Sequence, residues 1–188
     1  ANGAALSGNG SVGSINNNGL VVSGANARVL RVAGNLTNAP TGVLALTVTS
    51  PTVTPLVVGG AATLGGGLVV NNLLPYTGDA SYALITAGGG VNGTFSATDL
   101  PEQAFLDTSL VYNANEVALN VSRNQNSFAA VAATSNQRAA ASALSSNGVA
   151  GAALQNEIVN LSTAGARAAF DSLSGEIHAS TASAILED

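Results

Sequence analysis

The chain contains 188 residues, of which 46% are hydrophobic and only 8% are charged, and its formal net charge is −5. So low a charge content in so hydrophobic a sequence excludes a disordered chain, because disorder requires low hydrophobicity and high charge. The five basic residues are all arginines, and Arg28 and Arg31 are the only close pair. Phosphate binding needs clustered basic residues, so the composition predicts no nucleic-acid partner.

Cysteine is absent, and no run of 18 apolar residues is present that could span a bilayer as a helix. Asp79 is the first acidic residue, so residues 1–78 carry only arginine charges. The chain begins Ala1-Asn2-Gly3 without a methionine, and we expect it to be an excised piece of a longer protein.

Residues 1–123 are a series of short β runs separated by Gly, Asn, Thr and Pro. Each run has three to six residues, too few for a helix, and turn residues bound nearly all of them. The expected strands cover residues 20–22, 29–32, 43–48, 56–58, 68–70, 82–85, 110–112 and 117–121. Strands so closely spaced leave no room for the helices of βαβ units, so the pattern predicts a mainly β fold.

The triplet Leu-Val-Val occurs three times, beginning at Leu20, Leu56 and Leu68. The second interval between these starts is one third of the first, which suggests a repeating step of about 12 residues. Such a step is typical of a β solenoid, in which each turn stacks on the last, inward positions form aliphatic ladders and corners carry Gly and Asn. We expect Gly65–Gly67 and Gly88–Gly90 to be corners.

A β-sandwich is the alternative architecture, because it also uses many short strands. Sandwiches usually place large aromatic side chains in a central core. Here no aromatic residue precedes Tyr76, and five of the seven lie between Tyr76 and Tyr112. This gradient favours a solenoid with a thin aliphatic interior and a bulkier C-terminal end.

From Asn124 onward the periodicity becomes helical. The run Thr134-Ser135-Asn136-Gln137 has the form of a capping box, and Asn147-Gly148 has that of a helix stop. The expected helices cover residues 138–144, about 152–160, from Ser162 or Thr163 to Gly175, and 176–187. Short Ala-rich helices are marginal alone, so they must pack against one another or against another part of the protein.

One catalytic arrangement is conceivable in the helical region. Asp171, Ser174 and His178, the single histidine, lie at spacings that can share one helical face. A hydrolase triad also needs an oxyanion hole and a substrate cleft, and Gly175 is expected to break the helix between these residues. We therefore interpret His178 as an exposed or packed helix residue and predict no catalytic residue.

Metal and cofactor sites are not predicted either. Asp99, Glu102 and Asp107 cluster around Pro101, but they lack the loop spacing of a calcium site. One histidine without any cysteine argues against zinc, and the glycine runs lack the Gly-Lys-Ser/Thr ending of a phosphate-binding loop. We interpret the acidic cluster as a solvated loop and the glycines as turn residues, and we expect no cofactor.

Several passages of the chain resemble autotransporter (type V secretion) passengers. The C-terminal coils of these passengers are similar to LVVGGAATLGGGLVV (56–70), YALITAGGGVNGTF (82–95) and SLVYNANEVALNVSR (109–123), and the segment joining them to their membrane barrel is similar to NSFAAVAATSNQRAAASAL (126–144) and LSTAGARAAFDSLSGEIHAS (161–180). The run Leu-Ser-Gly-Glu-Ile-His-Ala-Ser at 173–180 is the most specific of them.

The resemblance implies a right-handed parallel β-helix over residues 1–123, whose last coils, at about 56–123, act as an autochaperone that folds first and templates the rest. Residues 124–188 would be an α-helical linker or cap preceding a membrane β-barrel that is absent from this chain. The implied partners are that barrel and the outer-membrane assembly machinery, and the implied location is the bacterial cell surface, reached through the periplasm. The chain departs from the family in containing no protease, esterase or adhesin module.

The leading prediction is thus a structural, non-enzymatic stem and folding module. The alternative is an adhesin-type binding module whose β-helix surface contacts host glycans or proteins, which an exposed aromatic ladder would favour. An enzyme of the β-helical lyase type would need carboxylates and basic groups along one face, whereas no acid precedes Asp79.

Overall fold

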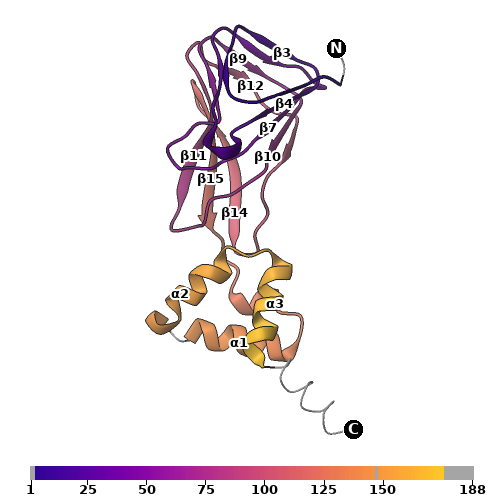
Figure 1. Cartoon of the computed structure of the whole chain (residues 1–188). Helices are drawn as coiled ribbons and strands as arrows, with labels where there is room; N and C mark the ends of the chain where they lie inside the picture. Colours follow the sequence, from indigo (N-terminus) through magenta and orange to yellow (C-terminus); the bar gives the residue numbers. More distant parts are fainter. Residues whose placement is uncertain (1–2, 147, 176–188) are drawn as a thin grey trace. The chain divides into compact units, whose positions relative to one another are not determined.

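The structure is a computed structural model that describes residues 3–146 and 148–175, with 37% of the chain in strands and 23% in helices. These residues divide into two units, coloured from indigo to yellow along the chain in Figure 1. The strand unit comprises Ala1–Pro75, Asp79–Pro101 and Thr108–Val121, and the helical unit comprises Tyr76–Gly78, Glu102–Asp107 and Ser122–Asp188. The fold is therefore mainly β, as predicted, with three mostly parallel sheets and three short helices.

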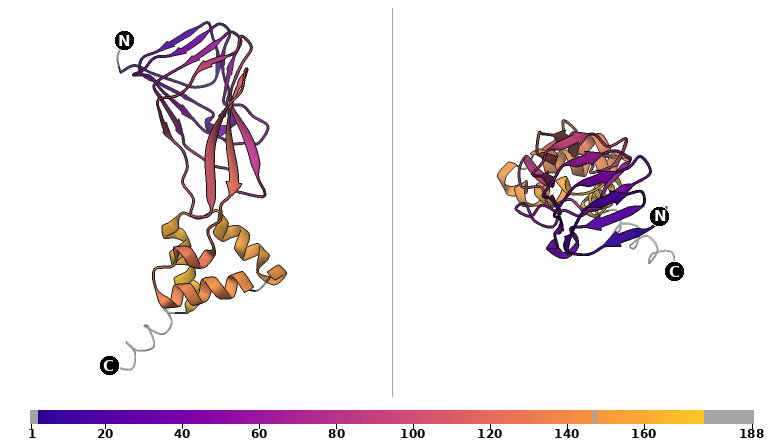
Figure 2. Two further views of the ribbon diagram at one scale, coloured as in Figure 1. Left: turned by 180° about the vertical axis from the view of Figure 1, so that it is seen from behind. Right: turned by 90° about the horizontal axis from the view of Figure 1, so that it is seen from above.

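Successive strands belong in turn to three sheets, and up to β13 every third strand returns to the same sheet (Figures 1 and 2). The first sheet has the order β1 (Ala5–Ser7), β4 (Leu20–Ser23), β7 (Val43–Leu46), β10 (Gly67–Val70), β13 (Ala97–Asp99). The second has the order β2 (Gly10–Val12), β5 (Leu30–Val32), β8 (Leu56–Val58), β11 (Ala80–Ala87), β15 (Glu116–Arg123), β14 (Leu106–Tyr112). The third has the order β3 (Ile15–Asn17), β6 (Leu36–Asn38), β9 (Ala62–Leu64), β12 (Val91–Gly93). A 3₁₀ turn, η1 (Ala25–Ala27), lies between β4 and β5.

The register of the first sheet shows that the expected repeating step is wrong. The paired positions of this sheet are Ala5, Leu20, Val43, Gly67 and Ala97, and the intervals between them are unequal and all longer than the expected step. The triplets at 56 and 68 lie in β8 and β10, which belong to different sheets within one turn. The triplet at 20 is shifted by one position against the triplet at 68, so Leu20 is 37% exposed whereas Val21 is 2% exposed.

Aliphatic ladders fill the space between the sheets, as expected. Three inward rows run through the paired strands: Val21, Leu44 and Leu68 in the first sheet, and Leu30, Leu56 and Ile85 together with Val32, Val58 and Ala87 in the second. All of these side chains are buried. Burial of one such Val, Leu or Ile side chain contributes about 1.5–3 kcal/mol, so the ladders are the main stabilising feature of the strand unit.

In the third sheet, two buried asparagines, Asn17 of β3 and Asn38 of β6, occupy inward positions. Asn17 pairs in register with Asn38, and its Nδ2 donates to Asn38 Oδ1 at 2.7 Å and to the Val43 carbonyl at 3.0 Å. Asn38 Nδ2 donates in turn to the carbonyls of Gly42 at 3.2 Å and Gly65 at 2.5 Å. Each carboxamide thus satisfies backbone carbonyls at the corner that leads to the first sheet, which offsets the cost of its burial.

Glycines stack at the corner between the second and third sheets. Gly34 N donates to the Gly13 carbonyl at 2.6 Å, Gly60 N to the Gly34 carbonyl at 2.9 Å, and Gly89 N to the Gly60 carbonyl at 2.9 Å. We call Gly13, Gly34, Gly60 and Gly89 the glycine column. A Cβ on Gly89 would lie 2.7 Å from the Ala61 nitrogen, so turns can approach this closely only without a side chain. The expected corner at Gly88–Gly90 is present, whereas that at Gly65–Gly67 is shorter than expected, because Gly67 is already the first residue of β10.

The parallel pairing of the second sheet ends at β11. Ile85 pairs in parallel with Leu56 on one side, while on the other side β11 runs antiparallel to β15. The antiparallel register shifts between Ala83 and Ile85, so Leu84 is the extra residue of a β-bulge. Because of the bulge, the consecutive residues Leu84 and Ile85 are both fully buried.

Three helices and a 3₁₀ turn, η2 (Phe128–Val131), form most of the helical unit: α1 (Ser135–Ser146), α2 (Gly148–Val159) and α3 (Thr163–Ser174). The predicted capping box is confirmed, since Gln137 N donates to Thr134 Oγ1 at 3.1 Å and Thr134 N donates to Gln137 Oε1 at 3.3 Å. Ser162 caps α3 through Gly165 N at 3.2 Å, and Gly175 ends it with a positive φ of 72°. The expected fourth helix lies outside the described residues.

Helix α2 begins about four residues earlier than the sequence suggested, because Gly148 is its first residue rather than a spacer after α1. The core of the unit contains Phe170, Ala166 and Ile158, all at most 1% exposed. Phe105 and Phe128 pack edge to face with ring centroids 5.0 Å apart. The Ala-rich helices therefore gain stability from tertiary packing around a few large side chains.

Candidate functional site

Two residues of the conceivable catalytic group, Asp171 and Ser174, already make structural hydrogen bonds. Asp171 Oδ1 accepts a hydrogen bond from Gln137 Nε2 at 2.8 Å, which ties α3 to the capping box of α1. Ser174 Oγ donates to the Asp171 backbone carbonyl at 2.8 Å. His178 lies outside the described residues. Asp171 and Ser174 thus have structural partners of their own: Asp171 is linked to the buried Gln137 of α1, and Ser174 bonds within α3.

The acidic residues around Pro101 do not gather into a metal site among the residues that the structure describes. Asp99 is the last residue of β13, whereas Glu102 precedes β14 and Asp107 lies within it. Asp99, Glu102 and Asp107 belong to different units of the chain, with Asp99 alone in the strand unit.

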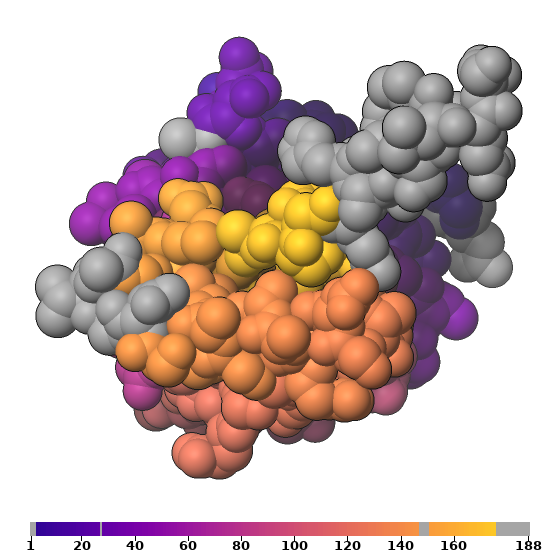
Figure 3. Space-filling view, turned by 90° about the horizontal axis from the view of Figure 1, so that it is seen from below, coloured from indigo at the N-terminus to yellow at the C-terminus, as the bar shows by residue number. Residues whose placement is uncertain are grey.

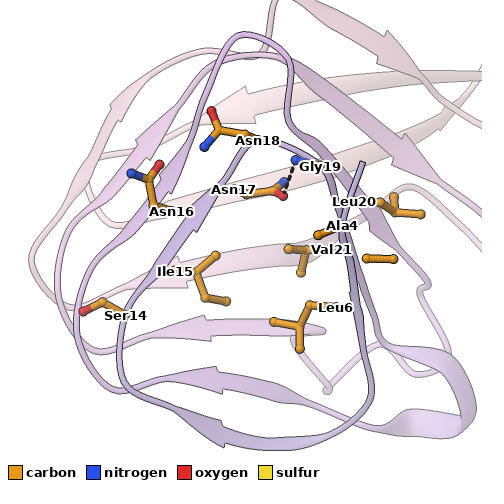
Figure 4. Close-up of a pocket in the computed structure, with 11 residues that line it drawn as sticks. Ala4, Leu6, Ser14, Ile15, Asn16, Asn17, Asn18, Gly19, Leu20 and Val21 are labelled. Atoms are coloured by element: carbon orange, nitrogen blue, oxygen red, sulfur yellow. Dashed lines mark hydrogen bonds between the residues drawn. The ribbon is translucent and has the colours of Figure 1, made fainter. Parts of the chain in front are cut away.

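An open hollow lies beside the first strands of the strand unit. It has a volume of about 290 Å³ and is lined by residues of β1, β3 and β4 and by the corner between β3 and β4. Figure 4 shows Leu6, Ile15 and Val21 pointing into the space enclosed by these strands, while Asn16 and Asn18 point away from it. No charged residue is among the described residues that line the hollow, and its polar side chains are those of Ser14 and three asparagines, so a serine hydroxyl is present without an acid or base beside it in the lining.

The N-terminal edge, by which we mean β1, β2 and β3, is the outermost strand position of all three sheets. Leu6 is 38% exposed there, and β1 and β2 are exposed along nearly their whole length. Proteins usually protect such edges with charged residues or proline. Residues 1–27 contain neither, so this edge is chemically suited to pairing with another β strand.

A smaller apolar hollow of about 170 Å³ lies on the helical unit, where α1, α2 and α3 form one face (Figure 3). It is lined by Ala140, Ala143, Leu144, Leu154 and Leu173. Leu154 and Leu173 are 40% and 46% exposed, the highest values among the large apolar side chains described in this unit. All the described side chains that line the hollow are those of alanine and leucine.

Arg123, the last residue of β15, has several partners within the helical unit. Its guanidinium lies 5.1 Å from the Phe105 ring centroid and 5.6 Å from that of Phe128. Nη1 donates to the Phe105 carbonyl at 2.7 Å, and Nη2 donates to the Asn126 carbonyl at 3.0 Å. Burial lowers the pKa of Arg123, and the nearby Tyr76 opposes this by raising it. The aromatic faces and carbonyls make this a structural clamp within the helical unit.

No protein-family model matches the chain, and no curated protein matches its sequence. Among the described residues, no helix has the length and apolar character needed to cross a membrane.

Sequence reasoning did not anticipate the N-terminal edge or the buried asparagines. An edge depends on which strands have a neighbour on one side only, and no local pattern encodes that. The asparagines carried a partial signal, because Asn17 and Asn38 each follow an apolar residue by two positions and could have been interpreted as inward residues of short strands.

Proposed function

We propose that the strand unit is a right-handed parallel β-helix and that the chain is a structural stem and folding module of an autotransporter-like passenger. The observation that carries the proposal is the strict rotation of strands through three sheets, with parallel register between successive turns. Crossover connections between parallel strands are right-handed in about 98% of cases, which supports the handedness. In this proposal the turns from residue 56 to 123 are the autochaperone, and residues 124–188 lead to a membrane barrel and its assembly machinery.

The long strands of the C-terminal turns support a folding role for them. β11 and β15 have eight residues each and place the fully buried Ile85, Val117 and Leu119 in one antiparallel pair, whereas β1 to β10 have three or four residues each. This pair adds to the parallel stack. The stability of a solenoid is roughly a sum of terms for each turn and its neighbours, so the C-terminal turns should be the most stable and able to nucleate the others.

The alternative function, an adhesin-type binding module, gains little support, because exposed aromatic side chains would favour it. Tyr82, Phe95, Phe105, Phe128 and Phe170 are all buried, and Tyr76 and Tyr112 are half-buried. The outward residues of the third sheet, including Asn16, Thr37 and Thr63, are polar and small. A regular stem without a binding surface fits these observations better, and we therefore place the adhesin-type function second.

Native-state hydrogen exchange on the whole chain tests the proposal. Under increasing denaturant, amides of β4 and β5 should exchange first, and those of β8, β11 and β15 last, near the free energy of global unfolding. If amides of β4 and β5 outlast those of β8, β11 and β15, the C-terminal turns are not the stable end and the autochaperone proposal is wrong.

A pair of buried truncations gives a kinetic test of the same proposal. Ile85→Val and Val21→Ala each remove apolar atoms from side chains that are at most 2% exposed. If the C-terminal turns form the folding nucleus, Ile85→Val slows refolding, whereas Val21→Ala mainly accelerates unfolding. Stopped-flow refolding and unfolding in denaturant measure both rates, and a refolding rate that responds to Val21 but not to Ile85 contradicts the proposal.

A further inference from the structure

The Asn-Gly pairs of the chain differ sharply in how the structure holds them. The sequence contains five such pairs, and three of them lie wholly within the described residues: Asn9-Gly10, Asn18-Gly19 and Asn92-Gly93. In an Asn-Gly pair, the glycine nitrogen can attack the asparagine side chain, because no Cβ obstructs the approach. How quickly it does so depends on how freely that glycine backbone can move and on what contacts the side-chain carbonyl.

Gly10 begins β2 and pairs with Leu30 of β5, yet it is the least constrained of the three glycines. A Cβ built on Gly10 would meet no atom within 4 Å, and its nitrogen donates only a long hydrogen bond of 3.4 Å to the Val29 carbonyl. Asn9, Gly10 and Arg28 are all exposed. In addition, Arg28 Nη1 donates to Asn9 Oδ1 at 3.3 Å, so a guanidinium contacts the oxygen that gains negative charge when the side-chain carbonyl is attacked.

Backbone contacts fix the glycines of the other two Asn-Gly pairs, Gly19 and Gly93. Gly19 N donates to Asn17 Oδ1 at 3.1 Å, the bond drawn as a dashed line in Figure 4, and the Gly19 carbonyl accepts from Val43 N at 2.7 Å. Gly93 lies in β12 and pairs with Leu64 of β9, so closely that a Cβ added to Gly93 would meet the Leu64 carbonyl oxygen at 2.6 Å. Both glycines are therefore fixed in the sheet framework.

We propose that Asn9 is a site of spontaneous deamidation promoted by Arg28. The Gly10 nitrogen loses its proton and forms a bond to Asn9 Cγ, the bond from Cγ to the side-chain nitrogen breaks, and ammonia leaves, which produces a five-membered succinimide. Water then hydrolyses either of the two carbonyl–nitrogen bonds of the ring and yields an aspartate or an isoaspartate residue. The reaction needs water alone and involves no oxidation or reduction.

The product changes the character of the N-terminal edge. It places a carboxylate beside Arg28 and next to β2, in a part of the chain that has no acidic group before Asp79. Charged groups on an edge strand hinder pairing with another chain. Deamidation would thus give this edge a charge that the encoded sequence does not supply.

The test is incubation of the folded whole chain at neutral pH, followed by proteolysis and mass spectrometry of the peptides that contain each Asn-Gly pair. Asn9 should react faster than Asn18 and Asn92. Arg28→Gln should slow the reaction at Asn9 by about two- to fivefold, the range expected for an exposed charged contact. Arg31→Gln is the matched control, because Arg31 is an exposed arginine on β5 and its replacement changes the net charge equally.

The same measurement in strong denaturant separates structure from local sequence, because the effect of Arg28 should vanish when the chain is unfolded. The proposal is overturned if Asn18 or Asn92 reacts as fast as Asn9 in the folded chain. It is also overturned if Arg28→Gln and Arg31→Gln leave the same rate at Asn9.

Discussion

Replacement of Gly89 by alanine tests whether the glycine column limits how closely the turns can stack. The new Cβ would lie 2.7 Å from the Ala61 nitrogen and 2.8 Å from the Gly60 carbonyl carbon. Both are backbone atoms, and Gly60 is itself held by its bond to the Gly34 carbonyl, so no flexible side chain can move aside. Overpacking of this kind costs about 1–3 kcal/mol.

The matched control is Gly13→Ala at the other end of the same column. Gly13 has no atom within 4 Å of an added Cβ, and neither Gly13 nor Gly89 has a positive φ, so the two sites differ in contacts and not in backbone freedom. Gly13→Ala should be neutral or should stabilise the chain by about 0.4–1 kcal/mol through the unfolded state.

Thermal and urea unfolding followed by circular dichroism measure the difference. For a chain of this length, 1 kcal/mol corresponds to about 2–4 °C, so Gly89→Ala should lower Tm by about 2–12 °C. If Gly89→Ala is as stable as the parent chain, or if both variants lose the same stability, the glycine column does not constrain the stacking.

Three further substitutions test contacts described above. Asn38→Ala removes a buried carboxamide that bonds two backbone carbonyls and should cost about 1–3 kcal/mol in urea unfolding, whereas Asn16→Ala, on an exposed side chain of the neighbouring strand, should change stability by less than about 0.5 kcal/mol. Gln137→Glu sets a carboxylate against Asp171 in place of a donor; it should destabilise the helices at neutral pH, and the loss should shrink on acidification, because a protonated carboxyl can donate again. A loss that does not depend on pH would refute this. Arg123→Lys keeps the charge but not the planar fork and should cost about 1–3 kcal/mol, and an unchanged midpoint in denaturant would show that the clamp adds no stability.

The strands that sequence reasoning found and those it missed differ in residue type. All eight expected strands are present, and each contains at least two of Val, Leu, Ile and Tyr. The third sheet was missed entirely. Its strands read Ile-Asn-Asn, Leu-Thr-Asn, Ala-Thr-Leu and Val-Asn-Gly, which are three residues long and rich in residues typical of turns.

The third sheet forms because the chain pairs with its own earlier turns, which overrides weak local propensity. Only every second residue of such a strand faces inward, so one apolar residue such as Leu36 is enough to anchor it. The helices were easier to predict, because capping residues such as Thr134 and Ser162 act locally and their hydrogen bonds connect neighbours in sequence.

The absence of predicted catalytic, metal and cofactor residues stays a prediction. The sequence alone is enough to make this prediction, because catalysis and metal or cofactor binding depend on residue types that this chain largely lacks. It could not reveal the N-terminal edge, which depends on the strand order of all three sheets, or the contact between Arg28 and Asn9, which depends on the pairing of β2 with β5 and joins residues about 20 positions apart.

The unequal spacing of paired positions in the first sheet also has a consequence for protein engineering. Because turns of very different length keep the same strand register, the sheets do not dictate how much chain lies between two strands. The segment from 47 to 55, between β7 and β8, already leaves the sheets and exposes Pro51 and Thr52 at its tip. A foreign peptide inserted there would add only loop-closure entropy, which rises slowly with length, so this position is suited to display of an epitope on the stem.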